Sequence, residues 1–172
     1  MLASIQIRSA VPADALAVAR VHVRSWQAAY RGLLPIDYLD GLRPEDRAAR
    51  YDFTHSDPVK PYTRIAVDGE AILGFATTMP TSDPALAGYG ELCALYVDPE
   101  RWGSGLGAAL MVDARDRMAG QGFRHALLWL LKGNARADRF YRRDGWSPDG
   151  QLKRELMWGI EVEDLRYQRP LP

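Results

Sequence analysis

Apolar residues in this chain form short strand-like runs that alternate with stretches of helical spacing. Strands are predicted at residues 5–8, 63–67, 71–78, 92–97, 126–131, 151–157 and 160–169. The runs 92–97 and 126–131 are almost continuously apolar, as in strands buried on both faces. Asp68-Gly69 predicts a hairpin between the second and third runs, because both turn positions favour positive φ.

Helices are predicted where apolar residues recur every three or four positions. After Pro12 and Asp14, one helix face carries Leu16, Ala19, Val23, Trp26 and Tyr30, and Gly32 is the expected C-cap. Further helices are predicted at residues 35–39, 44–52, 109–118 and 134–143, the last capped by Asn134; loops are predicted at 55–62 and 81–90, and a Pro-Asp-Gly turn at 147–150. This order predicts an α/β fold, a mixed sheet with helices on both faces, in one domain over residues 1–172.

The charge balance excludes some function classes. The 22 Lys and Arg residues equal the 22 Asp and Glu residues, which argues against nucleic acid or an anionic membrane as partner. No apolar run approaches the ~18 residues of a membrane span, and no signal segment opens the chain, so a cytoplasmic location is expected. No metal is expected, because His22, His55 and His125 are far apart. Cys93, the single cysteine, is interpreted as a small buried residue.

Residues 102–108, Trp-Gly-Ser-Gly-Leu-Gly-Ala, form a glycine-rich loop between a predicted strand and a predicted helix. Backbone N–H groups at the start of a helix favour a phosphate or pyrophosphate. A dinucleotide fold fits poorly, because five residues separate the strand from Gly103 and no acid follows the next strand. A nucleoside-triphosphate loop would need a Gly-Lys-Ser/Thr sequence that is missing here. Coenzyme A is the third alternative.

Two segments resemble the GNAT N-acetyltransferase superfamily. Residues 95–107 (LYVDPERWGSGLG) look like its motif A, and residues 134–146 (NARADRFYRRDGW) look like its motif B, one helix and one strand later. The resemblance implies a mostly antiparallel sheet of about seven strands, splayed between the fourth and fifth. It also implies acetyl-CoA as cofactor, with its pantetheine arm bonded to a strand edge.

The resemblance assigns the cofactor to two groups of residues. They are Leu95, Tyr96, Val97, Trp102, Gly103, Ser104, Gly105, Leu106, Gly107 and Ala108 in the first motif, and Asn134, Ala137, Phe140 and Tyr141 in the second. One position departs from the family pattern, since Trp102 stands where Gln or Arg is usual.

Arg136, Arg139 and Arg143 share one face of the last helix. A solvated face is expected, with contact to the ribose phosphate as the alternative.

The resemblance also implies catalytic roles. Tyr141 is the expected acid for the leaving thiolate, and Glu91 is the candidate base for the attacking amine. Trp26 and Tyr30 belong to a pattern that recurs near the acceptor pocket of similar proteins; the alternative is that both are core residues of the first helix. Trp129 is interpreted as core.

The leading hypothesis is transfer of an acetyl group from acetyl-CoA to a primary amine of a small molecule or peptide. The alternative is a catalytically silent acyl-CoA-binding or sensing module on the same fold. A nicotinamide-dependent oxidoreductase is disfavoured by the loop context. A homodimer is a further expectation, because dimers are common among similar proteins.

Overall fold

The computed structural model describes residues 4–157 and 159–172, and these form one seven-stranded sheet. The strands are β1 (Ile5–Ser9), β2 (Tyr62–Asp68), β3 (Ala71–Pro80), β4 (Tyr89–Val97), β5 (His125–Leu131), β6 (Ser147–Met157) and β7 (Ile160–Pro170). Their order across the sheet is β1-β2-β3-β4-β5-β7-β6, and the β4–β5 pair is parallel whereas the other pairs are antiparallel. The predicted α/β fold with a mixed, mostly antiparallel sheet is confirmed.

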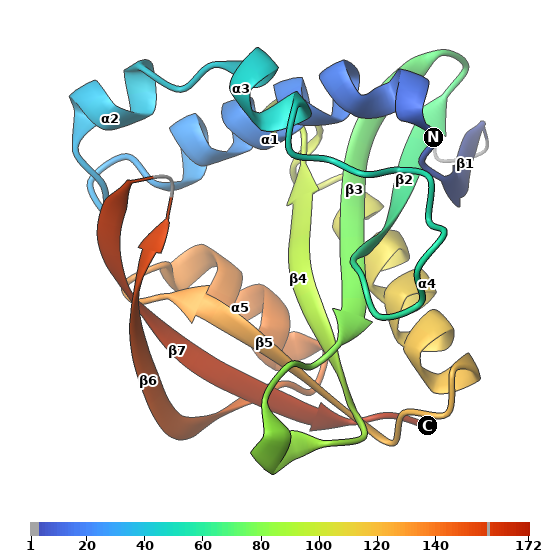
Figure 1. Cartoon of the computed structure of the whole chain (residues 1–172). Helices are drawn as coiled ribbons and strands as arrows, with labels where there is room; N and C mark the ends of the chain where they lie inside the picture. Colours follow the sequence, from blue (N-terminus) through green and yellow to red (C-terminus); the bar gives the residue numbers. More distant parts are fainter. Residues whose placement is uncertain (1–3, 158) are drawn as a thin grey trace.

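The helices cover both faces of this sheet (Figure 1). They are α1 (Ala15–Ala29), α2 (Ile36–Asp40), α3 (Pro44–Ala48), α4 (Leu106–Gly120) and α5 (Ala135–Arg143), with 3₁₀ turns at Pro12–Asp14, Pro84–Leu86 and Pro99–Arg101. Val18 and Val21 of α1 pack on Ile65 of β2, whereas Leu110 of α4 packs with Ala66 on the opposite face. Neighbouring strand residues point to opposite faces, so β2 supports a helix on each side.

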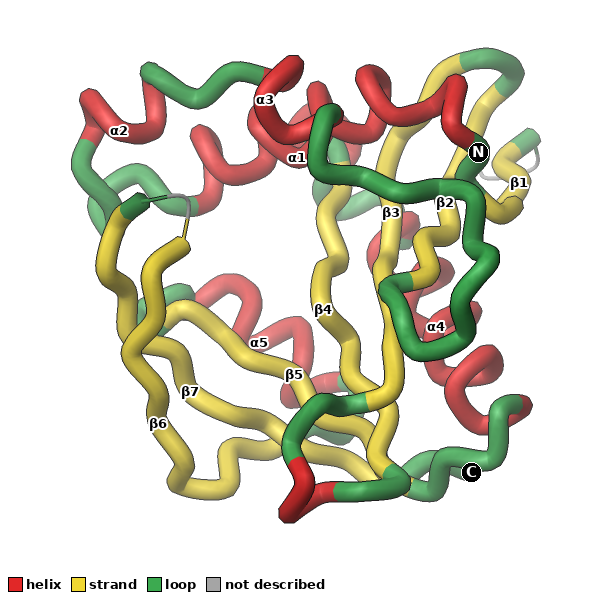
Figure 2. The backbone as a smooth tube through the Cα atoms, in the orientation of Figure 1, coloured by secondary structure: helices red, strands yellow, loops and turns green. Residues whose placement is uncertain are grey.

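The sheet opens between β4 and β5. Thr77 of β3 pairs with Ala94 and Thr78 pairs with Leu92, so Cys93 is the extra residue of a β-bulge. The β4–β5 pairing runs from Tyr89–His125 to Leu92–Leu128 and covers no described residue beyond the bulge. The two strands then diverge, as the tube in Figure 2 shows.

This divergence corrects two predictions. The strand at 92–97 is not buried on both faces, because Ala94, Leu95 and Tyr96 are only half-buried beyond the bulge. Cys93 is exposed rather than a small core residue. An apolar run predicts burial, but here part of the run faces a cavity inside the fold.

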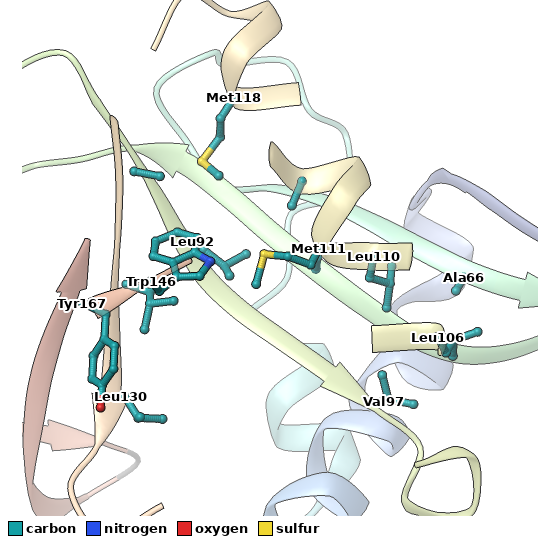
Figure 3. Close-up of a cluster of buried hydrophobic side chains, with 14 of the residues drawn as sticks. Ala66, Leu92, Val97, Leu106, Leu110, Met111, Met118, Leu130, Trp146 and Tyr167 are labelled. Carbon is teal, nitrogen blue, oxygen red and sulfur yellow. The ribbon is translucent and has the colours of Figure 1, made fainter. Parts of the chain in front are cut away.

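The largest core cluster lies between the sheet and α4 and holds the two halves of the sheet together (Figure 3). Leu106, Leu110, Met111, Ala114 and Met118 form the buried stripe of α4. Trp146 and Tyr167 join the same cluster from beyond β5. The apolar spacing of α4 therefore bridges the region where the sheet is open.

Other predictions differ from the structure in extent. Residues 147–150 lie in β6 rather than in a separate turn, because the strand absorbs them through a register shift between Pro148 and Leu152. The helix predicted at 44–52 ends at Ala48, and the one predicted at 109–118 extends over Leu106–Gly120. Within the described residues, no helix is long and apolar enough to span a membrane.

Candidate active site

A cavity of about 820 Å³ occupies the place where β4 and β5 diverge. Its walls come from β4 and β5, the glycine loop, α5 and the last turn of α1. Of the residues predicted to contact cofactor or acceptor, those that line it are Tyr30, Leu95, Tyr96, Val97, Trp102, Gly103, Gly105, Gly107, Ala108, Asn134, Ala137, Phe140 and Tyr141. The tertiary structure thus brings both sequence motifs to one cavity.

Four predicted residues lie outside this lining within the described part of the chain: Trp26, Glu91, Ser104 and Leu106. The Leu106 side chain is buried in the core, so its contribution to a ligand is restricted to its backbone. Trp26 is only 2% exposed, and its ring lies 5.0 Å from that of Tyr30. Trp26 therefore supports the cavity wall from behind.

The glycine loop has a backbone that side chains would disfavour. Gly103 and Gly105 have φ values of 78° and 87°, in the left-handed region that glycine adopts without strain. Gly105 is the N-cap of α4, and no side chain caps this helix start. The first N–H groups of α4 therefore remain available to an anion, with the helix dipole behind them.

Trp102 stands where Gln or Arg is usual in the family, and its side chain is held by a hydrogen bond and by a cation–π contact. Its indole Nε1 donates a hydrogen bond of 3.0 Å to the Val97 carbonyl, which also accepts a 2.9 Å bond from Ser25 Oγ. The guanidinium carbon of Arg136 lies 3.6 Å from the centre of a Trp102 ring. Both lone pairs of the Val97 carbonyl are thus occupied, so a ligand would have to use other backbone groups of β4.

Helix α5 presents its predicted motif to the cavity. Asn134 Oδ1 accepts a 3.2 Å hydrogen bond from the Ala137 amide, which confirms the predicted N-cap. Arg136, Arg139 and Arg143 are exposed, as expected for a solvated face, and all three also line the cavity. The spacing of the three arginines was the available signal in the sequence.

Three tyrosines, Tyr30, Tyr96 and Tyr141, are among the residues that line the cavity. The Tyr30 and Tyr96 hydroxyls are 3.2 Å apart. Burial raises the pKa of Tyr141, and the nearby Tyr96 adds to the effect. The Tyr141 hydroxyl therefore stays protonated at neutral pH and can donate a hydrogen bond or a proton.

Glu91 and Cys93 lie on β4 on either side of its divergence from β5. Burial raises the pKa of Glu91; the neighbouring Lys153 opposes this shift and Glu155 adds to it. Cys93 lines the cavity, but the surrounding protein atoms and Glu91 raise the pKa of its thiol well above the ordinary value. A thiol that stays protonated is a poor nucleophile. Trp129, interpreted from sequence as core, is half-buried and lines the same cavity.

Within the described residues, no group of three or more His, Cys, Asp or Glu side chains has a metal-binding arrangement. The cavity therefore offers its ligand backbone amides, arginines, tyrosine hydroxyls and apolar walls. These groups suit a long ligand with anionic groups near the glycine loop and an apolar arm between the strands.

Comparisons with known proteins agree with this geometry. Residues 23–146 match the model of the acetyltransferase (GNAT) family. The chain is 28% identical over 130 residues to the uncharacterized N-acetyltransferase YuaI of Bacillus subtilis, covering 76% of this chain and 73% of that protein. It is 30% identical over 133 residues to a phosphinothricin N-acetyltransferase of Streptomyces coelicolor, covering 74% and 76% respectively.

A solved structure shares the fold over almost the whole chain. The PaiA N-acetyltransferase from Thermoplasma acidophilum, crystallised with coenzyme A, superimposes with a TM-score of 0.73 at 21% identity, covering 97% of this chain and 99% of that one. The family match spans both motifs, the diverging strands and the C-terminal part of α1. The chain therefore belongs to the GNAT family of acetyltransferases.

Proposed function

We propose that this acetyltransferase moves an acetyl group from acetyl-CoA to a primary amine of a small molecule or peptide, by direct attack in a ternary complex. The observation that carries the proposal is the continuous cavity from the uncapped start of α4, past the diverging edges of β4 and β5, to Tyr141. The uncapped start of α4 suits the pyrophosphate, and the apolar walls from β4 and β5 suit the pantetheine arm.

The residues present fit this cofactor. The amides of residues 103–107 would hold the pyrophosphate, with Arg136 and Arg139 as nearby cations. Leu95 and Tyr96 border the strand edge where a pantetheine arm would lie. Acetyl-CoA supplies the activated thioester. The protein has to orient this thioester, accept a proton from the attacking amine and donate a proton to the leaving thiolate.

The two protons assign roles to Glu91 and Tyr141. A free alkyl amine has a pKa of ~10 and needs to lose a proton before it attacks, whereas the leaving thiol has a pKa of ~8.5 and gains from a proton donor. The raised pKa of Glu91 suits a base that acts through water, since Glu91 lies outside the cavity lining. Tyr141, protonated and at the cavity wall, suits the acid.

Two measurements on the purified protein test this function. Calorimetry with acetyl-CoA should give a binding heat at micromolar to millimolar ligand, and a thiol-release assay over a panel of primary amines should detect turnover. Tight binding without acetylation of any amine would instead support the silent module. No heat with acetyl-CoA would refute both.

Glu91→Gln tests the assignment of the base. Because the amide cannot accept the amine proton, kcat should fall about 10²–10⁴-fold while the Kd for acetyl-CoA stays near that of the native protein. Glu70→Gln, in the exposed β2–β3 turn, is the matched control. Unchanged turnover in Glu91→Gln would remove Glu91 from the mechanism.

A further inference from the structure

A second group of charged side chains lies on β6 and β7, beside the acceptor end of the cavity. Asp164 of β7 is in register with Leu131 of β5 and with Lys153 of β6. Residues in register on antiparallel strands share a face, and Leu131 lines the cavity. Asp164 therefore lies one strand behind the part of the cavity wall that Leu131 forms, and Asp164, Glu155 and Lys153 are not themselves lining residues.

Asp164 is buried without the partners that an ionised carboxylate needs. The residue is 2% exposed, and among the described residues no nitrogen or hydroxyl donor forms a hydrogen bond with either carboxyl oxygen. The group that faces it is the carboxyl of Glu155. Two carboxyls in contact need a shared proton, because neither ionised group can donate a hydrogen bond.

The titration of the pair agrees with this geometry. Burial, followed by the hydrogen bond and the charge of Glu155, raises the pKa of Asp164 to about 7. Burial acts to raise the pKa of Glu155 as well, but the hydrogen bond with Asp164 and the nearby Lys153 bring it below its usual value. Asp164 is thus the member that holds the proton, and Glu155 is the ionised one.

Next to the pair, the protein already binds an alkylammonium group of its own. Lys153 Nζ lies 3.2 Å from a Glu155 oxygen and 4.3 Å from the centre of a Trp129 ring. An aromatic face together with a carboxylate is a general recognition site for organic cations. Trp129 also lines the cavity, so this chemistry is available to a ligand.

The field of the pair reaches both sides of the proposed reaction centre. Lys153 and Glu155 shift the pKa of Glu91 on β4, and Asp164 shifts those of Tyr30 and Tyr96. Arg166, the other cation near Trp129, is already engaged by Asp149 and Asp83. The positive charge of Arg47 acts to lower the pKa of Tyr96. The Cys93 thiol has a raised pKa and stays protonated, so it adds no charge to this region. Three carboxyl groups therefore share this region with one ammonium group, that of Lys153.

We propose that the Asp164–Glu155 pair determines acceptor specificity by binding a second ammonium group of the acceptor, beside the amine that is acetylated. This inference rests on the proposed acetyltransferase function. Glu155, which is partly exposed, would contact the ammonium, and Asp164 is the positioning residue behind it.

Binding is coupled to loss of one proton. In the empty site, the Asp164 carboxyl is neutral and Glu155 is ionised. When the ammonium enters, the O–H bond of Asp164 breaks and the proton passes to the buffer, so the pair changes from one negative charge to two. The incoming positive charge balances the change, and no other bond is made or broken.

Calorimetry on the protein saturated with coenzyme A tests the inference without turnover. The probes are linear diaminobutane and aminobutane, which differ by one ammonium group. We expect diaminobutane to bind at least about tenfold more tightly. At about pH 6.5, its heat should vary between buffers of different ionisation enthalpy, in proportion to the protons released by Asp164.

Three variants separate the roles. Glu155→Gln should abolish the preference for diaminobutane, and the isosteric Asp164→Asn should abolish proton release while binding persists. Glu163→Gln, adjacent in sequence but paired with Lys132 and Arg154 on the opposite face, should leave both properties unchanged. Circular dichroism checks that each variant is folded.

Equal affinity for the two amines, or proton release that persists in Asp164→Asn, would overturn the inference. If either result were found in a protein that binds acetyl-CoA and acetylates aminobutane, the proposed acetyltransferase function would be retained and only the role of the Asp164–Glu155 pair would be refuted. If acetyl-CoA itself did not bind, both proposals would be refuted.

Discussion

The side chain of Tyr141 packs against the core and also reaches the cavity. Its ring packs edge-on against Trp146, at a centroid distance of 6.3 Å, while the residue also lines the cavity. Burial keeps its hydroxyl protonated, as described above. A residue packed in this way holds its hydroxyl in one place, which a proton donor to a transient thiolate requires.

Tyr141→Phe removes the hydroxyl and keeps the ring. If Tyr141 is the acid, kcat should fall about 10²–10⁴-fold, with a Kd for acetyl-CoA within about twofold of native. Stopped-flow detection of thiol release and calorimetry measure the two quantities. Tyr89→Phe, at the start of β4 and outside the cavity lining, is the control. Full activity in Tyr141→Phe would assign the acid to another group.

At the level of elements, the active site depends on how closely α4 approaches β3. Gly74 of β3 lies beneath this helix: a Cβ added there would come within 3.0 Å of the Tyr96 carbonyl oxygen and 3.1 Å of Leu110 Cδ1. The first contact is to the backbone of β4, which cannot rotate away. Gly74 therefore sets the spacing of α4, β3 and β4 at the level of the cavity.

Gly74→Ala should consequently destabilise the protein by about 1–3 kcal/mol, because one methyl group overpacks a fixed contact. Urea unfolding followed by circular dichroism measures the change. The matched control is Gly120→Ala at the end of α4, where an added Cβ meets no atom within 4 Å. That variant should be neutral or up to about 1 kcal/mol more stable. Equal stabilities of the two variants would contradict the role of Gly74.

Across the whole molecule, the open sheet places a buried acid where an uninterrupted core would exclude one. The two halves of the sheet are bridged by the α4 cluster, and Asp164 lies on the other face, beside the cavity. A buried carboxyl with a raised pKa costs stability whenever it is ionised. Ionisation of Asp164 therefore lowers the free energy of unfolding.

This cost predicts a pH dependence of stability. Burial raises the pKa of Asp164 from 3.8, the value for a solvated aspartate, to about 7 in the folded protein. Between these values the native state binds a proton that the unfolded state lacks, so this group's contribution to stability falls as pH rises, and it is constant above about 7. Asp164→Asn stays neutral and should exceed the native protein in stability by at least about 1 kcal/mol near pH 8, with the difference vanishing near pH 4.

Denaturant unfolding of both proteins across this pH range measures the difference directly. Groups with lowered pKa values, such as Asp14 and Asp138, give the opposite slope but contribute equally to both proteins. A stability difference that does not change with pH would show that Asp164 is ionised in the native state throughout.

Local sequence determined the elements and the motifs of this protein. The hairpin between β2 and β3, the Asn134 cap, the apolar stripe of α4 and the glycine loop depend on neighbours a few residues apart, so they could be recognised in the chain itself. The turn of that hairpin is Gly69-Glu70 rather than the predicted Asp68-Gly69, because Asp68 still pairs with Ala71. The order of these elements sufficed for the α/β class. The resemblance of residues 95–107 and 134–146 to a known family added the topology.

Tertiary structure alone decided what surrounds the cavity. The bulge at Cys93, the exposure of β4 to the cavity and the facing of Asp164 by Glu155 arise from strands distant in sequence. An apolar run looks the same whether it faces core or an internal cavity, and an acid on a strand gives no local sign of burial. Such features depend on register and on strand divergence, which are set by long-range pairing.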